Sequence, residues 1–282
     1  KLSHSQNFLK NPEFVKGLID KTNLGTDDFV VEIGPGKGII TKLLASKAGR
    51  IVAVEIDDKL FADLHKQFQK YPNVEIIEAD FLKWGLPSEP YKVFSNIPFN
   101  MTTEIVVKLL NADNPPTVTY LVMQDKAAER FIGDPISKNT QMSILLKPHF
   151  EMAIVARIDK KQFVPAPKVD AVLAMFKKRQ KPLVEPQLSQ LFRDFVVYGY
   201  NQWKPTLLEA FEKIFSHKQR TILEKEANIR GATPRDLDID QWLVLFQFFI
   251  DHVSDDKKGL VRGTEEGLKK QQEKLEKQFR TR

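Results

Sequence analysis

The first 176 residues alternate short apolar runs with stretches of helical spacing, and this alternation constrains the fold more than any other feature. Strands that alternate with helices form βαβ units, and such units build a mainly parallel sheet that is wound on both faces. In a sheet of this kind, residues at the carboxyl ends of the strands meet at one edge, where ligands bind. The predicted strands are Phe29–Ile33, Ile51–Glu55, Val74–Ile77, Val93–Asn96 and Val118–Met123.

Two further apolar runs, Met152–Ile158 and Ala171–Phe176, are joined by a proline-rich loop without a crossover helix. They predict an antiparallel hairpin at one edge of the sheet. Beyond residue 177 no strand pattern remains. We expect an α/β domain over 1–179, a small all-α domain over 180–252, and a charged tail over 253–282 that is either a solvated helix or disordered. The helices predicted in the second domain are Leu188–Tyr200, Pro205–Ser216 and Asp240–His252, the last of them capped by Asp238 or Asp240.

Composition excludes several classes of site and protein. The chain has no cysteine, which excludes a disulfide scaffold, a thiolate zinc site, an iron–sulfur cluster and a cysteine nucleophile. The five histidines have no metal-like spacing, so no metal site is predicted. No apolar run reaches the ~18 residues of a membrane span, and the first residues lack the apolar core of a signal peptide. We therefore expect a cytoplasmic protein that does not enter membranes.

The net charge of +6 is unevenly distributed. Residues 1–176 carry 22 basic and 21 acidic residues, whereas residues 177–282 carry 21 and 16. A nearly neutral front and a basic back suit a polyanionic partner for the second half of the chain, although a basic surface can also serve solubility alone.

A glycine-rich loop follows the first predicted strand, in the segment Glu32-Ile33-Gly34-Pro35-Gly36-Lys37-Gly38. Glycines there let a ligand approach the backbone, and the following helix offers free N–H groups. The dinucleotide fingerprint would read G-x-G-x-x-G, but this loop reads G-x-G-x-G. That spacing is typical of S-adenosylmethionine-dependent methyltransferases. The alternative is an ordinary tight turn.

Acidic side chains end the next two strands. Glu55 could accept hydrogen bonds from both hydroxyls of a ribose, or it could be an ordinary polar residue at a strand terminus. Asp80 could accept from the amino group of an adenine, with Phe81 beside the ring, although an aspartate in such a turn is more often a cap.

The most specific signal is Asn96-Ile97-Pro98-Phe99, which follows the fourth strand. The amide oxygen of Asn96 and the backbone carbonyl of Ile97 can both accept from an exocyclic amino group. Pro98 fixes the loop and removes one donor, and Phe99 offers a flat face on which a base can stack. The alternative is a strand-terminating turn with a core aromatic.

Taken together, these segments resemble the rRNA adenine N6-methyltransferases, a family that includes the erythromycin-resistance (Erm) enzymes and the small-subunit rRNA dimethyladenosine transferases. The resemblance covers roughly residues 3–250. It implies a Rossmann-like methyltransferase domain followed by a small helical domain, with S-adenosylmethionine as the cofactor. The matching segments are Ser5–Leu9, Glu32–Gly38, Val54–Asp57, Ala79–Phe81, Asn96–Phe99 and Phe163–Asp170.

The resemblance assigns roles to individual residues. It implies that Asn96, Ile97, Pro98 and Phe99 hold the target adenine, and that Phe163 is a second aromatic against the same base, unless Phe163 only anchors its proline-rich loop. The positions implied to hold the cofactor are Gln6, Asn7 and Leu9 in the N-terminal arm, Gly34 and Gly36 in the loop, and Glu55, Ile56, Asp80, Phe81 and Asn96 at the strand ends.

Three residues favour the Erm branch: Ser5 before Gln-Asn-Phe-Leu, Lys37 within the glycine loop, and Ile97 in place of the leucine common in the other branch. Phe99 departs from the family, in which tyrosine is commoner, so a hydroxyl contact is lost while stacking survives. The branch implies methylation of 23S rRNA and resistance to macrolide-type antibiotics. The close alternative is a 16S rRNA dimethyladenosine transferase that acts in ribosome biogenesis.

The implied partner is rRNA, bound by a monomer through basic residues. Each of these is individually more often a solvated surface charge. Two rival functions are an NAD-dependent oxidoreductase, disfavoured by the glycine spacing, and a nucleic-acid-binding protein without activity, disfavoured by the intact Asn96–Phe99 segment. The candidate RNA contacts are Lys10 and Lys16 near the arm, and Lys204, Lys213, Lys218, Arg220 and Lys225 in the helical domain.

Overall fold

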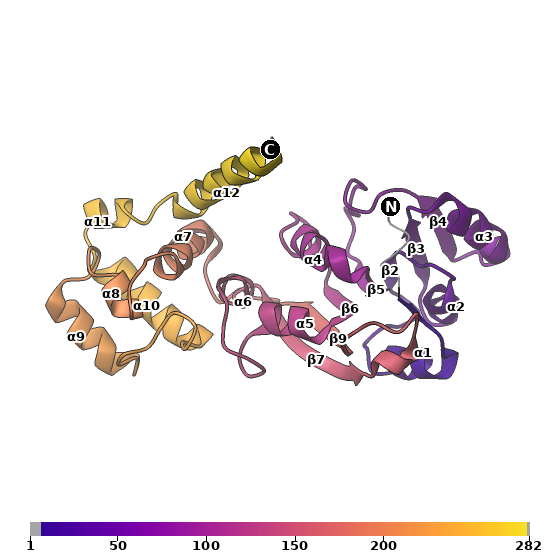
Figure 1. Ribbon diagram of the computed structural model, residues 1–282, viewed down its shortest axis with the longest axis horizontal. Helices are drawn as coiled ribbons and strands as arrows, with labels where there is room; N and C mark the ends of the chain where they lie inside the picture. Colours follow the sequence, from indigo (N-terminus) through magenta and orange to yellow (C-terminus); the bar gives the residue numbers. More distant parts are fainter. Residues whose placement is uncertain (1–6, 281–282) are drawn as a thin grey trace. The chain divides into compact units, whose positions relative to one another are not determined.

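The computed structural model describes residues 7–280, with side chains described as far as Lys274 (Figure 1). The chain forms two compact units, and each is described by itself. The first comprises the chain up to Glu129 together with Phe150–Arg179, and the second comprises Arg130–His149 and Gln180–Arg282. The sequence predicts one α/β domain over 1–179. In the structure, residues 130–149 belong to the helical unit.

The first unit contains a seven-stranded sheet in the order β4-β3-β2-β5-β6-β9-β7. The first five strands along this order are parallel to one another. Strand β9 pairs antiparallel with β6 on one side and with β7 on the other. The predicted α/β class and the antiparallel edge hairpin are confirmed, with β7 at the edge and β9 inside it. The strands are β2 (Phe29–Ile33), β3 (Arg50–Glu55), β4 (Val74–Glu78), β5 (Lys92–Asn96), β6 (Val118–Gln124), β7 (Phe150–Ile158) and β9 (Ala171–Lys178).

The strand order reverses direction between β2 and β5, because β3 and β4 extend the sheet on one side and β5 starts the other. Such a switch point leaves a crevice at the carboxyl ends of the strands. One face of the sheet is covered by α1 and α2, whose apolar residues share a buried cluster with β2, β3, β5 and β6. The helices of this part are α1 (Pro12–Ile19), α2 (Ile39–Ala45), α3 (Asp58–Phe68), α4 (Thr102–Leu110) and α5 (Asp125–Ile132), with 3-10 turns η2 (Phe99–Met101) and η3 (Lys160–Gln162).

A second, two-stranded sheet joins parts of the chain that are far apart in sequence. Strand β1 (Phe8–Leu9) pairs antiparallel with β8 (Phe163–Val164), in the register Phe8 to Val164 and Leu9 to Phe163. The backbone N–H of Lys10 extends this pairing by donating to the Gln162 carbonyl at 3.1 Å. The N-terminal arm is thereby fastened to the proline-rich loop that follows β7.

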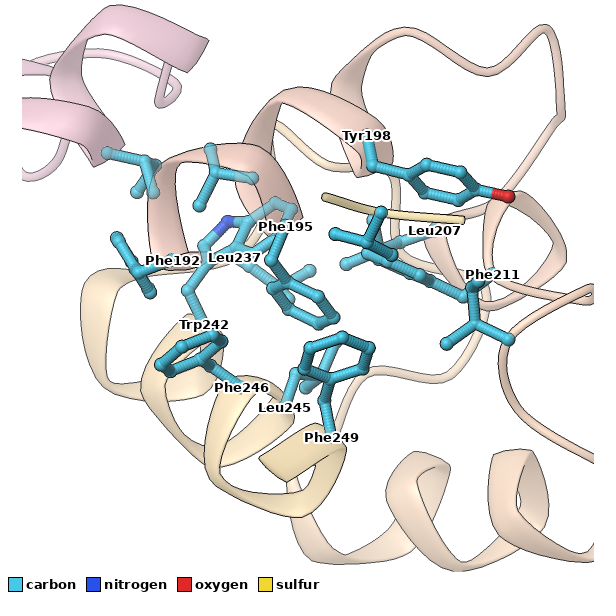
Figure 2. Packing of buried hydrophobic residues seen from close by; sticks show 14 of the residues in the cluster. Phe192, Phe195, Tyr198, Leu207, Phe211, Leu237, Trp242, Leu245, Phe246 and Phe249 are labelled. Carbon is cyan, nitrogen blue, oxygen red and sulfur yellow. The ribbon is translucent and has the colours of Figure 1, made fainter. Parts of the chain in front are cut away.

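The second unit is helical and is built around aromatic packing. Figure 2 shows rings from α7 facing rings from α10. Phe195 stacks on Phe211 at 4.5 Å between ring centroids and meets the edge of Trp242 at 6.0 Å. The carboxylate of Asp238 caps α10 and accepts from the N–H of Gln241, as one of the two predicted caps. The helices are α6 (Gln141–Leu146), α7 (Ser189–Tyr200), α8 (Leu207–Ala210), α9 (His217–Glu226), α10 (Ile239–His252), α11 (Asp255–Gly259) and α12 (Thr264–Arg280), with η4 at Pro186–Leu188.

Within the described residues, the charged tail forms helices α11 and α12. Asp194 of α7 accepts from the backbone N–H groups of Gly263 and Glu265 at 2.9 and 3.0 Å, and Arg193 pairs with Glu265 at 2.6 Å. Burial raises the pKa of Glu265, but the hydrogen bonds and charge of Arg193 outweigh it and lower the pKa to about 2. Helix α12 is therefore attached to α7 by charged groups that a search for apolar periodicity does not detect.

Candidate active site

A cavity of about 540 Å³ opens at the carboxyl ends of the parallel strands in the first unit. Its mainly apolar lining with a few polar groups is that of a small-molecule site. Residues from four different strand ends contribute to it, together with the start of α4, as the topology predicts. The lining residues are Ile33, Gly34, Val54, Glu55, Ile56, Ala79, Asp80, Phe81, Pro98, Met101 and Ile105.

Two glycines of the loop after β2 have different reasons to be glycine. Both have a positive φ, +62° at Gly34 and +60° at Gly36. A Cβ on Gly34 would meet nothing within 4 Å, so this backbone is open toward the cavity that it lines. A Cβ on Gly36 would lie 2.4 Å from the ring of Phe8. Gly36 therefore accommodates the N-terminal arm, and it lines neither this cavity nor the second one described below.

Glu55 is fully buried at the end of β3, and three backbone N–H groups hold its carboxylate. Oε2 accepts from Gly36 at 3.1 Å, and Oε1 accepts from Ile56 and Asp57 at 2.9 and 3.0 Å. These donors fix the orientation of the carboxylate where it lines the cavity. Each carboxylate oxygen has more than one lone pair, so acceptor capacity remains for a ligand.

Asp80 and Phe81 follow β4 and line the same cavity. One oxygen of Asp80 caps its own turn by accepting from the Leu82 N–H at 2.9 Å, and the other lies 3.7 Å from the ammonium of Lys83. Lys108 of α4 braces this turn, because its ammonium donates to the backbone carbonyls of Leu82 and Trp84 and lies 5.2 Å from the centre of the Phe81 ring. Burial lowers the pKa of Lys108. No pattern in the sequence indicates this support.

Glu32 of β2 is also buried, but it lies outside the cavity lining. The Thr41 hydroxyl donates to its Oε2 at 2.6 Å, and its Oε1 has no partner among the described residues. Burial raises the pKa of Glu32 to about 8, and the nearby charge of Glu55 adds to that shift. Glu32 therefore holds its proton to a higher pH than an ordinary glutamate, and it has a structural role beneath the loop.

This raised pKa predicts a pH-dependent stability. The folded protein holds a proton that the unfolded chain releases above its ordinary pKa of 4.5. The stability that Glu32 contributes is complete below pH 4.5 and is lost as the pH rises toward 8, by about 1.4 kcal/mol per unit at most. Glu32→Gln should remove this dependence. Urea unfolding at pH 5 and pH 8 measures it, with exposed Glu104→Gln as the control; equal pH slopes in wild type and Glu32→Gln would contradict the assignment.

A second cavity of about 300 Å³ adjoins the first, since Gly34 and Pro98 line both. Its other lining residues are Asn7, Phe8, Asn96 and Ile97. The amide nitrogen of Asn96 donates to the backbone carbonyl of Asn7 at 2.7 Å. Because a carbonyl can only accept, this bond fixes which end of the amide is the nitrogen. The amide oxygen is buried and has no hydrogen-bond partner among the described residues.

An unpaired buried acceptor is unfavourable by about 1–3 kcal/mol, and a native structure rarely keeps one without a reason. Here it belongs to the residue that the sequence singled out, at the point where the strand order reverses. The arrangement can accept a hydrogen bond from a donor group of a ligand in the second cavity.

The aromatic residues assigned to the target base are placed differently from one another. Phe99 is partly exposed, whereas Phe163 is only 2% exposed and packs its ring against the edge of Phe99 at 6.0 Å. Phe163 belongs to a buried apolar cluster, and its ring lines neither cavity. Leu9 is likewise a core residue, and its side chain lines neither cavity. Gln6 lies outside the described residues.

The predicted RNA contacts fall in both units. Lys10 and Lys16 are exposed in the first, and Lys204, Lys213, Lys218 and Lys225 are exposed in the second. Arg220 is half-buried. Among residues 7–280, no group of three or more histidine, aspartate or glutamate side chains could hold a metal ion, and no helix is long and apolar enough to cross a membrane.

Comparison with known proteins identifies the family. Residues 1–251 match the profile of the family described as Ribosomal RNA adenine dimethylase. The chain belongs to this family. It is 34% identical over 253 residues to an rRNA adenine N-6-methyltransferase of Bacillus licheniformis, covering 88% of this chain and 86% of that one. Ribosomal RNA small subunit methyltransferase A of Latilactobacillus sakei subsp. sakei is also 34% identical, over 229 residues that cover 78% and 77%.

Among solved structures of relatives, the crystal structure of the 23S rRNA methyltransferase ErmE superposes with a TM-score of 0.81 at 27% identity, covering 87% of this chain and 100% of that one. This agrees with the resemblance to the Erm branch. As a ribosomal RNA adenine dimethylase family member, the chain is an S-adenosylmethionine-dependent rRNA adenine N6-methyltransferase.

The residues present fit this cofactor. The open backbone at Gly34 leaves room for a ligand, the rigid carboxylate of Glu55 suits a diol, and an apolar wall that includes Ile56 and Phe81 suits a purine ring. Six lining residues were not among the predicted site residues: Phe8, Ile33, Val54, Ala79, Met101 and Ile105. Phe8 stands within the matching segment Ser5–Leu9, which is the one signal that could have revealed it.

Proposed function

We propose that this enzyme methylates N6 of a specific adenine in 23S rRNA and thereby confers resistance to macrolide-type antibiotics. The unpaired, buried amide oxygen of Asn96 carries the chemical part of the proposal. The likeness to the 23S rRNA methyltransferase ErmE supports the choice of RNA, as do Ser5, Lys37 and Ile97 in the sequence.

The N6 amino group of adenine is a poor nucleophile, because its lone pair is delocalised into the ring. Asn96 addresses this by accepting one N6 hydrogen at Oδ1, and the Ile97 carbonyl accepts the other. Two acceptors draw the nitrogen toward tetrahedral geometry and aim its lone pair. Because Asn96 is fixed by its bond to Asn7, this positioning is built into the site before the substrate arrives.

We place the cofactor in the first cavity. We assign the ribose hydroxyls to Glu55 and the adenine amino group to Asp80, whose Oδ2 keeps acceptor capacity beside Lys83, with Ile56 and Phe81 against the ring. When bound, S-adenosylmethionine supplies an electrophilic methyl group. Gly34 and Pro98 border both cavities, so they lie between the nucleoside end and the amide of Asn96.

The proposal needs no strong general base. Once methylated, N6 is cationic and acidic, so its proton can pass to water. Glu32, the buried acid with a raised pKa, lines neither cavity and is not assigned this role. The target adenine must leave its RNA stack to reach Asn96, and the partly exposed ring of Phe99 gives it a new stacking surface.

The alternative substrate is 16S rRNA, modified during ribosome biogenesis. It is supported by the 34% identity to a small-subunit methyltransferase, which equals the identity to the rRNA adenine N-6-methyltransferase of Bacillus licheniformis. Labelled S-adenosylmethionine incubated with protein-free 23S rRNA and, separately, with immature small subunits tests the choice. We expect label in 23S rRNA, and a macrolide-susceptible host should become resistant on expression of the wild type but not of Asn96→Ala. Label confined to small subunits would favour the alternative.

RNA binding should weaken steeply with salt, because phosphate contacts release counterions. Lys213→Ala should weaken binding about equally for all RNA sequences and reduce the salt slope by about 1. Filter binding of 23S rRNA between about 50 and 200 mM salt measures this, with Lys66→Ala on α3 as the control. A wild-type slope near zero would exclude a basic RNA-binding face.

We further propose that the enzyme acts as a monomer in the cytoplasm, on rRNA before or during ribosome assembly. The location and the timing follow from the proposed substrate, because the target base is accessible before the ribosome is complete.

A further inference from the structure

Trp203 is the most exposed large apolar residue among the described residues, at 101% of the accessibility of an extended chain. It lies in the loop between α7 and α8. The other two tryptophans differ, since Trp242 is fully buried in the aromatic core and Trp84 is half-buried. A single exposed apolar side chain is common on protein surfaces, so the groups around Trp203 decide whether it marks a binding site.

The loop that carries Trp203 is held at both of its ends. On one side, the Asn201 amide donates to the carbonyl of Val197 at 2.7 Å and to the side chain of Gln141 at 2.8 Å. On the other, Lys204 pairs with Glu212 at 2.7 Å, and Thr206 caps α8. The indole is therefore presented by a fixed loop.

Cations gather beside this loop. The pKa of Glu212 is lowered by its hydrogen bond to Lys204, and further by the charges of Lys204, Arg220 and Lys213. Three cations thus act on one carboxylate. The Nε of Arg220 is buried and has no hydrogen-bond partner among the described residues. Lys213 forms no ion pair with any residue that the structure describes. The three cations therefore share one carboxylate, that of Glu212, which the loop residue Lys204 contacts directly.

We propose that Trp203 stacks on an unpaired base of the RNA substrate while Lys204, Lys213 and Arg220 contact the adjoining phosphates. Aromatic rings interleaved with cations are the usual platform for single-stranded nucleic acid, because every base has a stacking face. A protein-binding surface would instead surround the tryptophan with apolar residues. The other exposed large apolar residues described in this unit, Leu183, Val244 and Leu260, lie on other segments.

This inference rests on the proposed function for the identity of the RNA, so its test uses an RNA that cannot be methylated. A uridine oligonucleotide of about 20 residues contains no adenine and has no stable secondary structure. Its affinity is measured by the anisotropy of a dye on the oligonucleotide, which also serves the variants without Trp203. Contact with the ring is measured in the wild type by the quenching of tryptophan fluorescence and its protection against acrylamide. A perfect RNA duplex of the same length, whose bases are already stacked, is the matched probe.

We expect the oligonucleotide to quench and protect the exposed tryptophan, and the duplex to do neither. Trp203→Ala should weaken binding of the oligonucleotide about tenfold, and Trp203→Phe, which keeps a ring, should recover most of it. Leu260→Ala, an exposed apolar control in the same unit, should bind as wild type. Because Trp203 is fully exposed, these variants should fold normally, which circular dichroism checks.

Unchanged affinity in Trp203→Ala, or protection by the duplex as strong as by the oligonucleotide, would overturn the proposal. So would sedimentation that shows a dimer lost in Trp203→Ala, because the ring would then bind a second copy of the chain. If the oligonucleotide binds through Trp203 but no rRNA is methylated, the proposed function fails and this inference stands.

Discussion

Asn96→Ala should lower the turnover of methyl transfer by about 10²- to 10³-fold, the usual effect of removing one preorganised hydrogen-bonding group from a reacting centre. The wild-type amide keeps an acceptor buried and unpaired, which is favourable only when a donor fills it. Single-turnover kinetics at saturating cofactor measure the effect, with cofactor binding followed separately by equilibrium dialysis.

Two further variants separate chemistry from structure at this position. Asn96→Asp keeps an acceptor but loses the donor to the Asn7 carbonyl, so it should fall between wild type and alanine. The nearby, exposed Asn100 is the matched control, and Asn100→Ala should turn over normally. Near wild-type turnover in Asn96→Ala with cofactor bound would contradict the proposed role.

The second large effect is expected at Glu55. Three backbone N–H groups donate to its carboxylate. In Glu55→Gln the NH2 group of the new side chain would face at least one of these N–H groups, and two donors cannot form a hydrogen bond. The charge-assisted contact to a ribose is lost as well. Each such contact is worth about 1.5–3 kcal/mol, so we expect the affinity for S-adenosylmethionine to fall by about 10- to 100-fold, with a lower melting temperature.

Calorimetry of cofactor binding measures the loss at Glu55. Glu78 is the matched control, because it pairs in register with Glu55 at the end of the neighbouring strand but is exposed and lines neither cavity. Glu78→Gln should bind the cofactor as wild type. Unchanged affinity in Glu55→Gln would mean that the ribose is held elsewhere.

The residues that meet at the strand ends were predictable from sequence. Gly34, Glu55, Asp80 and Asn96 each follow a recognisable apolar run, and parallel strands bring their ends to one edge. Local pattern therefore sufficed for the sheet and for most of the two cavities.

Contacts between distant segments were not predictable in this way. The pairing of Phe8 with Val164 joins residues more than 150 positions apart, and it belongs to the segment whose Phe8 ring packs against Gly36. The amide of Asn139 donates to the Leu237 carbonyl, 98 positions away, within the helical unit. Such contacts are made by single polar groups and short strands, which leave no periodic signal in the sequence.

The charged tail shows the same limit. Its few apolar residues predicted either a solvated helix or disorder, whereas α12 is attached through Arg193, Asp194 and Glu265. The sequence does not distinguish Glu265 from the other glutamates of the tail, because its partner Arg193 lies 72 positions away.

The central claim is that the amide of Asn96 directs methyl transfer to N6 of one adenine in 23S rRNA. The most direct test is to modify protein-free 23S rRNA with labelled S-adenosylmethionine, map the labelled nucleotide and identify it by mass spectrometry. The account predicts N6-methylated adenosine at a single site, made by wild type and absent with Asn96→Ala. Label on another base or another ring position, or the same product from Asn96→Ala, would contradict it.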